Sequence, residues 1–165
     1  AGVLLEVARV HLARGEGFFA VAPAERAQAL APGDWRGPFL LAMAYEQSSR
    51  EAEALSAHRR AVQLAPDNPA VLSNLALFQA ARGQTAEAEA LLRHAASRPD
   101  ASVATRQNLA LILGLQGRLD EAEALARRDL PPQAVAANLA YLRAASADAP
   151  AAGAGRSWDA VSRAQ

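Results

Sequence analysis

The chain has 165 residues, of which 52% are hydrophobic and 5% aromatic, and its 17 basic and 17 acidic side chains give a net charge of zero. This balance argues against a nucleic-acid-binding arm or a patch for anionic membranes, because both need an excess of basic residues. The chain has no cysteine, which excludes disulfides and thiolate catalysis, and no apolar run approaches the ~20 residues of a membrane-spanning helix.

The sequence repeats with a period of 34 residues, since four rows that begin at Ala1, Trp35, Pro69 and Val103 align without gaps. The clearest columns are column 8 (Ala8, Ala42, Ala76, Ala110), column 20 (Ala20, Ala54, Ala88, Ala122) and column 15 (Gly15, Ser49, Gly83, Gly117). Alanine lets two helices approach closely, and a turn glycine accepts a positive φ after a helix. The columns therefore predict helix–turn–helix units that stack, because one unit cannot bury its apolar face alone.

This pattern resembles the tetratricopeptide repeat, a helical hairpin of about 34 residues. The resemblance implies an all-α fold, a helical-hairpin solenoid that winds into a right-handed superhelix. Residues 1–34 form a degenerate first repeat, with a glycine-rich "GEGFF" after the first helix. Proline is favoured at the first position of a helix, so we predict that the second helix of this repeat begins at Pro23.

Residues 35–68 and 69–102 match the repeat well, and the first of these keeps the tyrosine that the family favours, Tyr45. Residues 103–132 are predicted to form a shortened repeat that ends at Pro131-Pro132, and residues 133–145 a single helix that caps the last open face. Residues 146–165 are rich in alanine and glycine and are predicted to be a tail. Within this tail, "SWDAVSRA" is a candidate helix that docks through Trp158.

No group of residues in the sequence is arranged for chemistry. The three histidines, His11, His58 and His94, occupy different columns and lack the i, i+4 spacing of a helical metal site. The acidic runs near the starts of the second helices are interpreted as solvated faces, where negative charge is favoured. We expect no enzyme activity, no metal and no cofactor.

In stacked tetratricopeptide repeats the first helices line a concave groove, and the resemblance assigns columns 2, 5, 6, 9, 12 and 13 to it. The predicted peptide-binding residues are Phe39, Met43, Asn74, Leu77, Gln107, Asn108 and Leu111. The same columns also bring Leu5, Arg9, Leu40, Gln47, Ser73 and Leu115 to this surface. Methionine and phenylalanine without strong charge suit an adaptable apolar contact with a helix or an extended peptide. Two interpretations of Asn74 and Asn108 remain open: hydrogen bonds to a bound peptide, or bonds within their own repeat.

The stretch "RQNLALILGLQGRLDEAEALARRDLPPQAVAANLAYLRA", from Arg106 to Ala144, is similar to the end of TadD-type proteins of Flp/Tad pilus systems. This resemblance implies an outer-membrane lipoprotein that faces the periplasm and helps the pilus secretin to assemble, as a pilotin does. A lipid anchor would then lie upstream of Ala1, and the missing initial methionine indicates a processed or shortened chain.

Two functions follow as expectations. The first is a non-enzymatic module that binds a protein or peptide, with the Tad secretin as the expected partner and no nucleic acid. The alternative is a scaffold that self-associates through the open edge of the first repeat or through the tail. The identity and direction of the bound peptide and the oligomeric state stay open.

Overall fold

The computed structural model describes residues 1–148, and these residues form nine α-helices and no strand. The helices are α1 (Gly2–Ala13), α2 (Gly17–Leu30), α3 (Arg36–Gln47), α4 (Glu51–Leu64), α5 (Pro69–Ala80), α6 (Thr85–Ala96), α7 (Val103–Leu115), α8 (Leu119–Ala126) and α9 (Pro132–Asp148). The all-α helical-hairpin fold is confirmed. The predicted capping helix is longer than expected, since α9 continues to Asp148. The rest of the predicted tail, with Trp158, lies outside the described residues.

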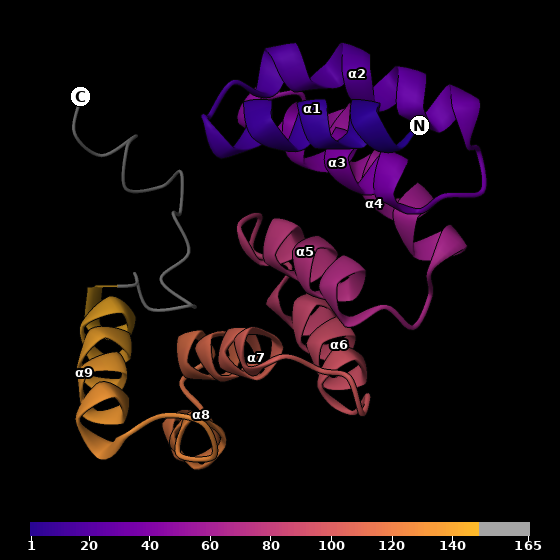
Figure 1. The fold of residues 1–165 in the computed structure, drawn as a ribbon. Coiled ribbons are helices and arrows are strands. Elements are labelled where there is room, and N and C mark those ends of the chain that lie inside the picture. The colour runs from indigo at the N-terminus through magenta and orange to yellow at the C-terminus, as the bar shows by residue number, and fades with distance from the viewer. Residues whose placement is uncertain (149–165) are drawn as a thin grey trace, which may run out of the picture. The chain divides into compact units, whose positions relative to one another are not determined.

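The described helices pack into two compact units that divide between Leu109 and Ala110, within α7. In the first unit, consecutive helices lie side by side, α1 with α2, α2 with α3, α3 with α4, and α5 with α6 (Figure 1). In the second unit, α8 packs on α9.

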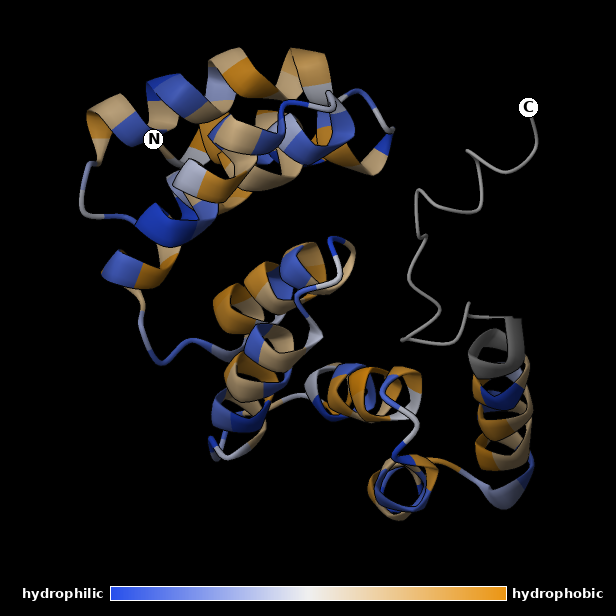
Figure 2. Ribbon diagram, turned by 180° about the vertical axis from the view of Figure 1, so that it is seen from behind, coloured by the Kyte–Doolittle hydropathy of each residue, from blue (hydrophilic) through white to orange (hydrophobic). Residues whose placement is uncertain are grey.

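Alanine makes the close helix contacts of the first unit. The side chains of columns 8 and 20 are fully buried there, at 0% exposure: Ala8, Ala20, Ala42, Ala54, Ala76 and Ala88. A methyl group at these points lets the helix backbones approach, and larger residues such as Leu72 and Leu92 fill the remaining space. Most helices carry both hydrophobic and hydrophilic residues, as expected of helices with one buried face (Figure 2).

The turn inside each hairpin has one residue with a positive φ, as column 15 predicts. The values of φ are 74° at Gly15, 57° at Ser49, 80° at Gly83 and 81° at Gly117. The residue after each one donates its backbone N–H to the carbonyl five residues earlier, for example Arg50 to Tyr45 at 2.8 Å. This is the Schellman ending of a helix, which satisfies carbonyls that the helix leaves free.

Ser49 is the one non-glycine residue with a positive φ in the described part of the chain, so Ser49→Gly should stabilise the protein by about 1 kcal/mol. The reverse change at the equivalent turn, Gly83→Ser, should cost a similar amount, because a Cβ there meets no atom within 4 Å and suffers only backbone strain. Urea unfolding of both variants measures the two changes. A shift of the same sign in both variants would contradict the explanation.

The prediction that the second helix begins at Pro23 is wrong. Helix α2 begins six residues earlier, at Gly17, and Pro23 lies inside it. Proline in a helix removes the hydrogen bond to the carbonyl four residues earlier. Packing offsets this loss, because Ala20, Ala24 and Ala27 of α2 are buried at 2% exposure or less. Tertiary contacts thus decide where α2 begins, against the local preference of proline.

Candidate functional site

Six of the seven predicted groove residues lie in the first unit. They are Phe39 and Met43 on α3, Asn74 and Leu77 on α5, and Gln107 and Asn108 near the start of α7. The seventh, Leu111, belongs to the second unit. All seven are half-buried, so each is anchored in the fold and still presents part of its surface. Phe39 and Met43 pack against the buried core, and the Phe39 ring meets the ring of Trp35 edge-on with centroids 5.4 Å apart.

Three other positions of the same columns, Leu5, Leu40 and Ser73, are buried, which corrects their assignment to the groove. Leu5 and Leu40 are buried core residues at 2% and 4% exposure. Ser73 is buried, and its hydroxyl donates to Thr105 Oγ1 at 3.3 Å. Gln47 is exposed, but its Nε2 donates to the carbonyl of Leu12 at 3.1 Å. These side chains are not part of the groove because they contact neighbouring helices instead of facing a ligand.

The amide side chains on these helices have unused hydrogen-bonding capacity. Among the described residues, neither Asn74 nor Asn108 has a side-chain hydrogen-bond partner. The Nε2 atom of Gln107 is buried without a partner, and an unsatisfied buried donor costs about 1–3 kcal/mol. The internal-bond interpretation of Asn74 and Asn108 therefore finds no support, and both amides are available to a ligand.

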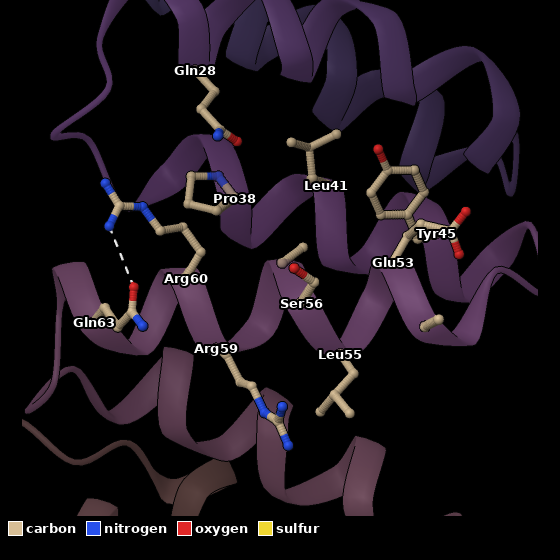
Figure 3. Close-up of a pocket in the computed structure, with 12 residues that line it drawn as sticks. Gln28, Pro38, Leu41, Tyr45, Glu53, Leu55, Ser56, Arg59, Arg60 and Gln63 are labelled. Atoms are coloured by element: carbon tan, nitrogen blue, oxygen red, sulfur yellow. Dashed lines mark hydrogen bonds between the residues drawn. The ribbon is translucent and has the colours of Figure 1, made fainter.

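A second surface, which the sequence did not predict, is a cleft of about 590 Å³ between α2 and α4 with α3 as its floor (Figure 3). Its lining consists of Gln28, Pro38, Leu41, Tyr45, Ala52, Glu53, Leu55, Ser56, Ala57, Arg59, Arg60 and Gln63. A smaller hollow of about 410 Å³ shares Gln28, Leu41, Tyr45 and Arg60 with it. None of the predicted groove residues lines either of these hollows.

At one end of the cleft the charged groups are paired. The Tyr45 hydroxyl donates to Glu25 Oε1 at 3.1 Å, and burial, together with this bond, raises the pKa of the Tyr45 phenol, so it keeps its proton. The Arg50 guanidinium lies over the Tyr45 ring and 3.0 Å from Glu53 Oε1. The backbone N–H of Glu53 and the Arg50 side chain lower the pKa of the Glu53 carboxyl, which therefore stays ionised.

Two arginines of the lining, Arg59 and Arg60, have no acidic partner within the described residues. Arg60 donates from Nη1 to Gln63 Oε1 at 3.3 Å, and Arg59 lines the cleft without an ion pair. The sequence itself indicates that these arginines lack acidic partners on their own helix, because neither has an acidic residue three or four positions away. Arg93, by contrast, pairs with Glu89 one turn before it. The repeat pattern does not reveal the missing partners, because it marks residues that recur between rows and not their ion pairs.

No group of three or more His, Cys, Asp or Glu side chains in residues 1–148 is placed to hold a metal ion. No helix of the described part is long and apolar enough to cross a membrane.

Comparison with known families gives the chain its classification. Models of the tetratricopeptide repeat match residues 47–102 and residues 102–130. The chain contains tetratricopeptide repeats. This tetratricopeptide-repeat protein is a protein–protein interaction module, and the repeat is generally a non-catalytic fold. No curated protein matches the sequence significantly.

Solved structures that are similar to this tetratricopeptide-repeat protein include two pilus proteins. PilF of Pseudomonas aeruginosa has 22% identity and a TM-score of 0.73 over 86% of this chain, which spans 66% of the PilF chain. PilW, a type IV pilus biogenesis factor, has 19% identity and a TM-score of 0.73 over 88% of this chain and 75% of its own. YrrB, described as having an unusual peptide-binding site, has 18% identity and a TM-score of 0.64 over 86% and 75%. At these identities the likeness shows the fold alone.

Proposed function

We propose that this tetratricopeptide-repeat protein is a TadD-like pilus-assembly factor that holds a segment of a partner protein against the first helices of its repeats. The observation that carries the proposal is the set of six half-buried residues in the first unit, with apolar side chains on α3 and α5 and, on α5 and α7, amides that have no partner in the described part of the chain. Leu111 belongs to the second unit, and the proposal does not depend on it. Two pilus proteins among the structural neighbours, together with the TadD-like stretch from Arg106 to Ala144, support the pilus assignment.

We propose the pilus secretin as the partner and the periplasmic side of the outer membrane as the location. Both rest on the resemblance to TadD-type proteins, with a lipid anchor upstream of Ala1. The chemistry of the surface fits a peptide in which apolar side chains contact Phe39, Met43 and Leu77 while Asn74 and Asn108 bond its backbone. With no charged group among these residues, we expect a Kd of about 1 μM, or about −8 kcal/mol, that changes little with salt.

The test is calorimetric titration of the chain with peptides that tile the C-terminal region of the secretin from the same genome. Leu77→Asp should weaken binding of the recognised peptide at least about tenfold, because it places a charge in an apolar contact. Leu30→Asp is the matched control, since Leu30 lies on α2 with 67% exposure, outside the proposed surface. Asn74→Ala should also weaken binding. Because this substitution introduces no charge, it should leave the protein folded.

Equal binding by Leu77→Asp, Asn74→Ala and the unmodified chain would refute the groove. Circular dichroism of each variant checks that the helices are intact. If no secretin peptide binds while the helices are intact, the proposed partner is wrong.

A second function, a self-assembling scaffold, is favoured by the exposed face of α1. Val3, Val7 and Val10 are 79%, 40% and 55% exposed. In the third repeat the same columns hold Val71, Leu75 and Phe78, all buried at 7% exposure or less. The i, i+4, i+7 spacing of the three valines is that of a coiled-coil seam, which suits pairing with α1 of a second copy. Sedimentation of the unmodified protein over a range of concentrations distinguishes the two functions. A protein that stays monomeric at every concentration does not form a scaffold.

A further inference from the structure

We propose that the cleft between α2 and α4 is a second binding site, for an extended peptide that carries an acidic side chain next to an apolar one. The cleft is separate from the surface of the proposed function, because none of the residues assigned to that surface lines it. All its lining residues belong to the first unit.

The size and lining of the cleft suit such a peptide. Its volume of about 590 Å³ falls within the ~300–1,000 Å³ of typical ligand sites. The smaller hollow that shares Leu41 and Tyr45 lengthens the cleft along α3. Pro38, Leu41 and Leu55 give it an apolar part, and Gln28, Ser56 and Gln63 give it groups that bond a peptide backbone.

The distribution of charge determines which peptide fits. In Figure 3 Gln28, Arg60 and Gln63 gather at one end of the cleft, whereas Tyr45 and Glu53 lie at the other. Glu53 is neutralised by Arg50, but among residues 1–148 Arg60 has only the neutral amide of Gln63 as a partner. A guanidinium matches the geometry of a carboxylate and binds it with two parallel hydrogen bonds. An acidic side chain on the ligand would complete the charge pairing of the cleft.

Arg59 reinforces this preference without forming the contact. Its side chain points away from that of Arg60 in Figure 3, yet it adds a second unpaired positive charge to the lining. Two arginines beside Glu53 are too few for a nucleic-acid backbone, which needs a basic surface. The cleft therefore favours one carboxylate in a mostly neutral, partly apolar ligand.

The experiment is an NMR titration of the ¹⁵N-labelled chain with an acetylated and amidated peptide, Gly-Glu-Leu-Gly, and with its Gly-Gln-Leu-Gly counterpart. The glutamate peptide should shift the side-chain amide signals of Gln28 and Gln63 and leave that of Asn74 unchanged. Arg60→Gln should weaken its binding about tenfold, as expected for loss of a charged hydrogen bond. Arg26→Gln is the matched control. This substitution removes the same charge, but Arg26 is an exposed residue of α2 that does not line the cleft.

The proposal is overturned if the glutamate peptide shifts no cleft signal, if the glutamine peptide binds equally well, or if Arg26→Gln weakens binding as much as Arg60→Gln. Acetate that binds as tightly as the peptide would make the site one for small carboxylates instead. The outcome is independent of the proposed pilus function, since Leu77→Asp should leave binding of the glutamate peptide unchanged.

Discussion

Gly17→Ala should lower the free energy of unfolding by about 3 kcal/mol, at the upper end of what overpacking usually costs. Gly17 is the buried first residue of α2, where this helix meets the end of α3. A Cβ at this position would lie 2.5 Å from the Cβ of Gln47 and 2.8 Å from the carbonyl oxygen of Ala44. Neither atom moves by a simple side-chain rotation, so α2 has to shift away from α3. Urea unfolding followed by circular dichroism measures the loss.

Gly33→Ala is the control for this change. A Cβ at Gly33 meets no atom within 4 Å, and its φ lies outside the left-handed region. We expect a change of less than about 0.5 kcal/mol, as for other surface substitutions. An equal loss in both variants would show that the close approach of α2 to α3 is not the cause.

His58→Ala should destabilise the protein by about 3 kcal/mol, because it removes a large buried side chain and leaves a cavity. His58 on α4 is 1% exposed, and its ring centroid lies 5.0 Å from that of Phe78 on α5. Its Nε2 atom lies 2.6 Å from Glu46 Oε1 on α3. The side chain thus links three helices of the first unit, and thermal and urea unfolding should both report its loss.

His58→Leu separates packing from hydrogen bonding. The same column of the next repeat holds Leu92, which is fully buried, so leucine fits a site of this kind. The Glu46 side chain is 36% exposed and regains hydrogen bonds from water when its partner is removed. We therefore expect His58→Leu to cost about 1 kcal/mol or less. A cost equal to that of His58→Ala would mean that the bond to Glu46, and not packing, holds these helices together.

The parts of the fold that the sequence predicts are those fixed by recurring residues. Alanine in columns 8 and 20 marks helix contacts, and column 15 marks the turns, including Ser49, where serine adopts the conformation of its glycine counterparts. The start of α2 was not predictable in this way. Local sequence favours a helix that begins at Pro23, whereas the contacts of the buried alanines extend the helix back to Gly17.

The candidate sites were predictable to different degrees. Column positions indicate the surface with Phe39 and Leu77, but they also include Leu40, which is buried. Leu40 is wrongly assigned because a column gives the average direction of a side chain and not its local packing. The cleft beside Arg60 combines residues of three helices. Its recognition requires knowing which charges are unpaired, and this depends on the packed structure.

The pattern of helix contacts in the first unit has a mechanical consequence. From α1 to α6 each helix packs on its immediate neighbours in the sequence, and α1 reaches no further than α3. A pulling force on the two ends of the unit therefore loads these contacts one after another instead of all at once. The unit should lengthen hairpin by hairpin, each step releasing on the order of 110 Å of chain at ~3.3 Å per residue. A protein built in this way yields gradually under tension and can regain its shape one hairpin at a time.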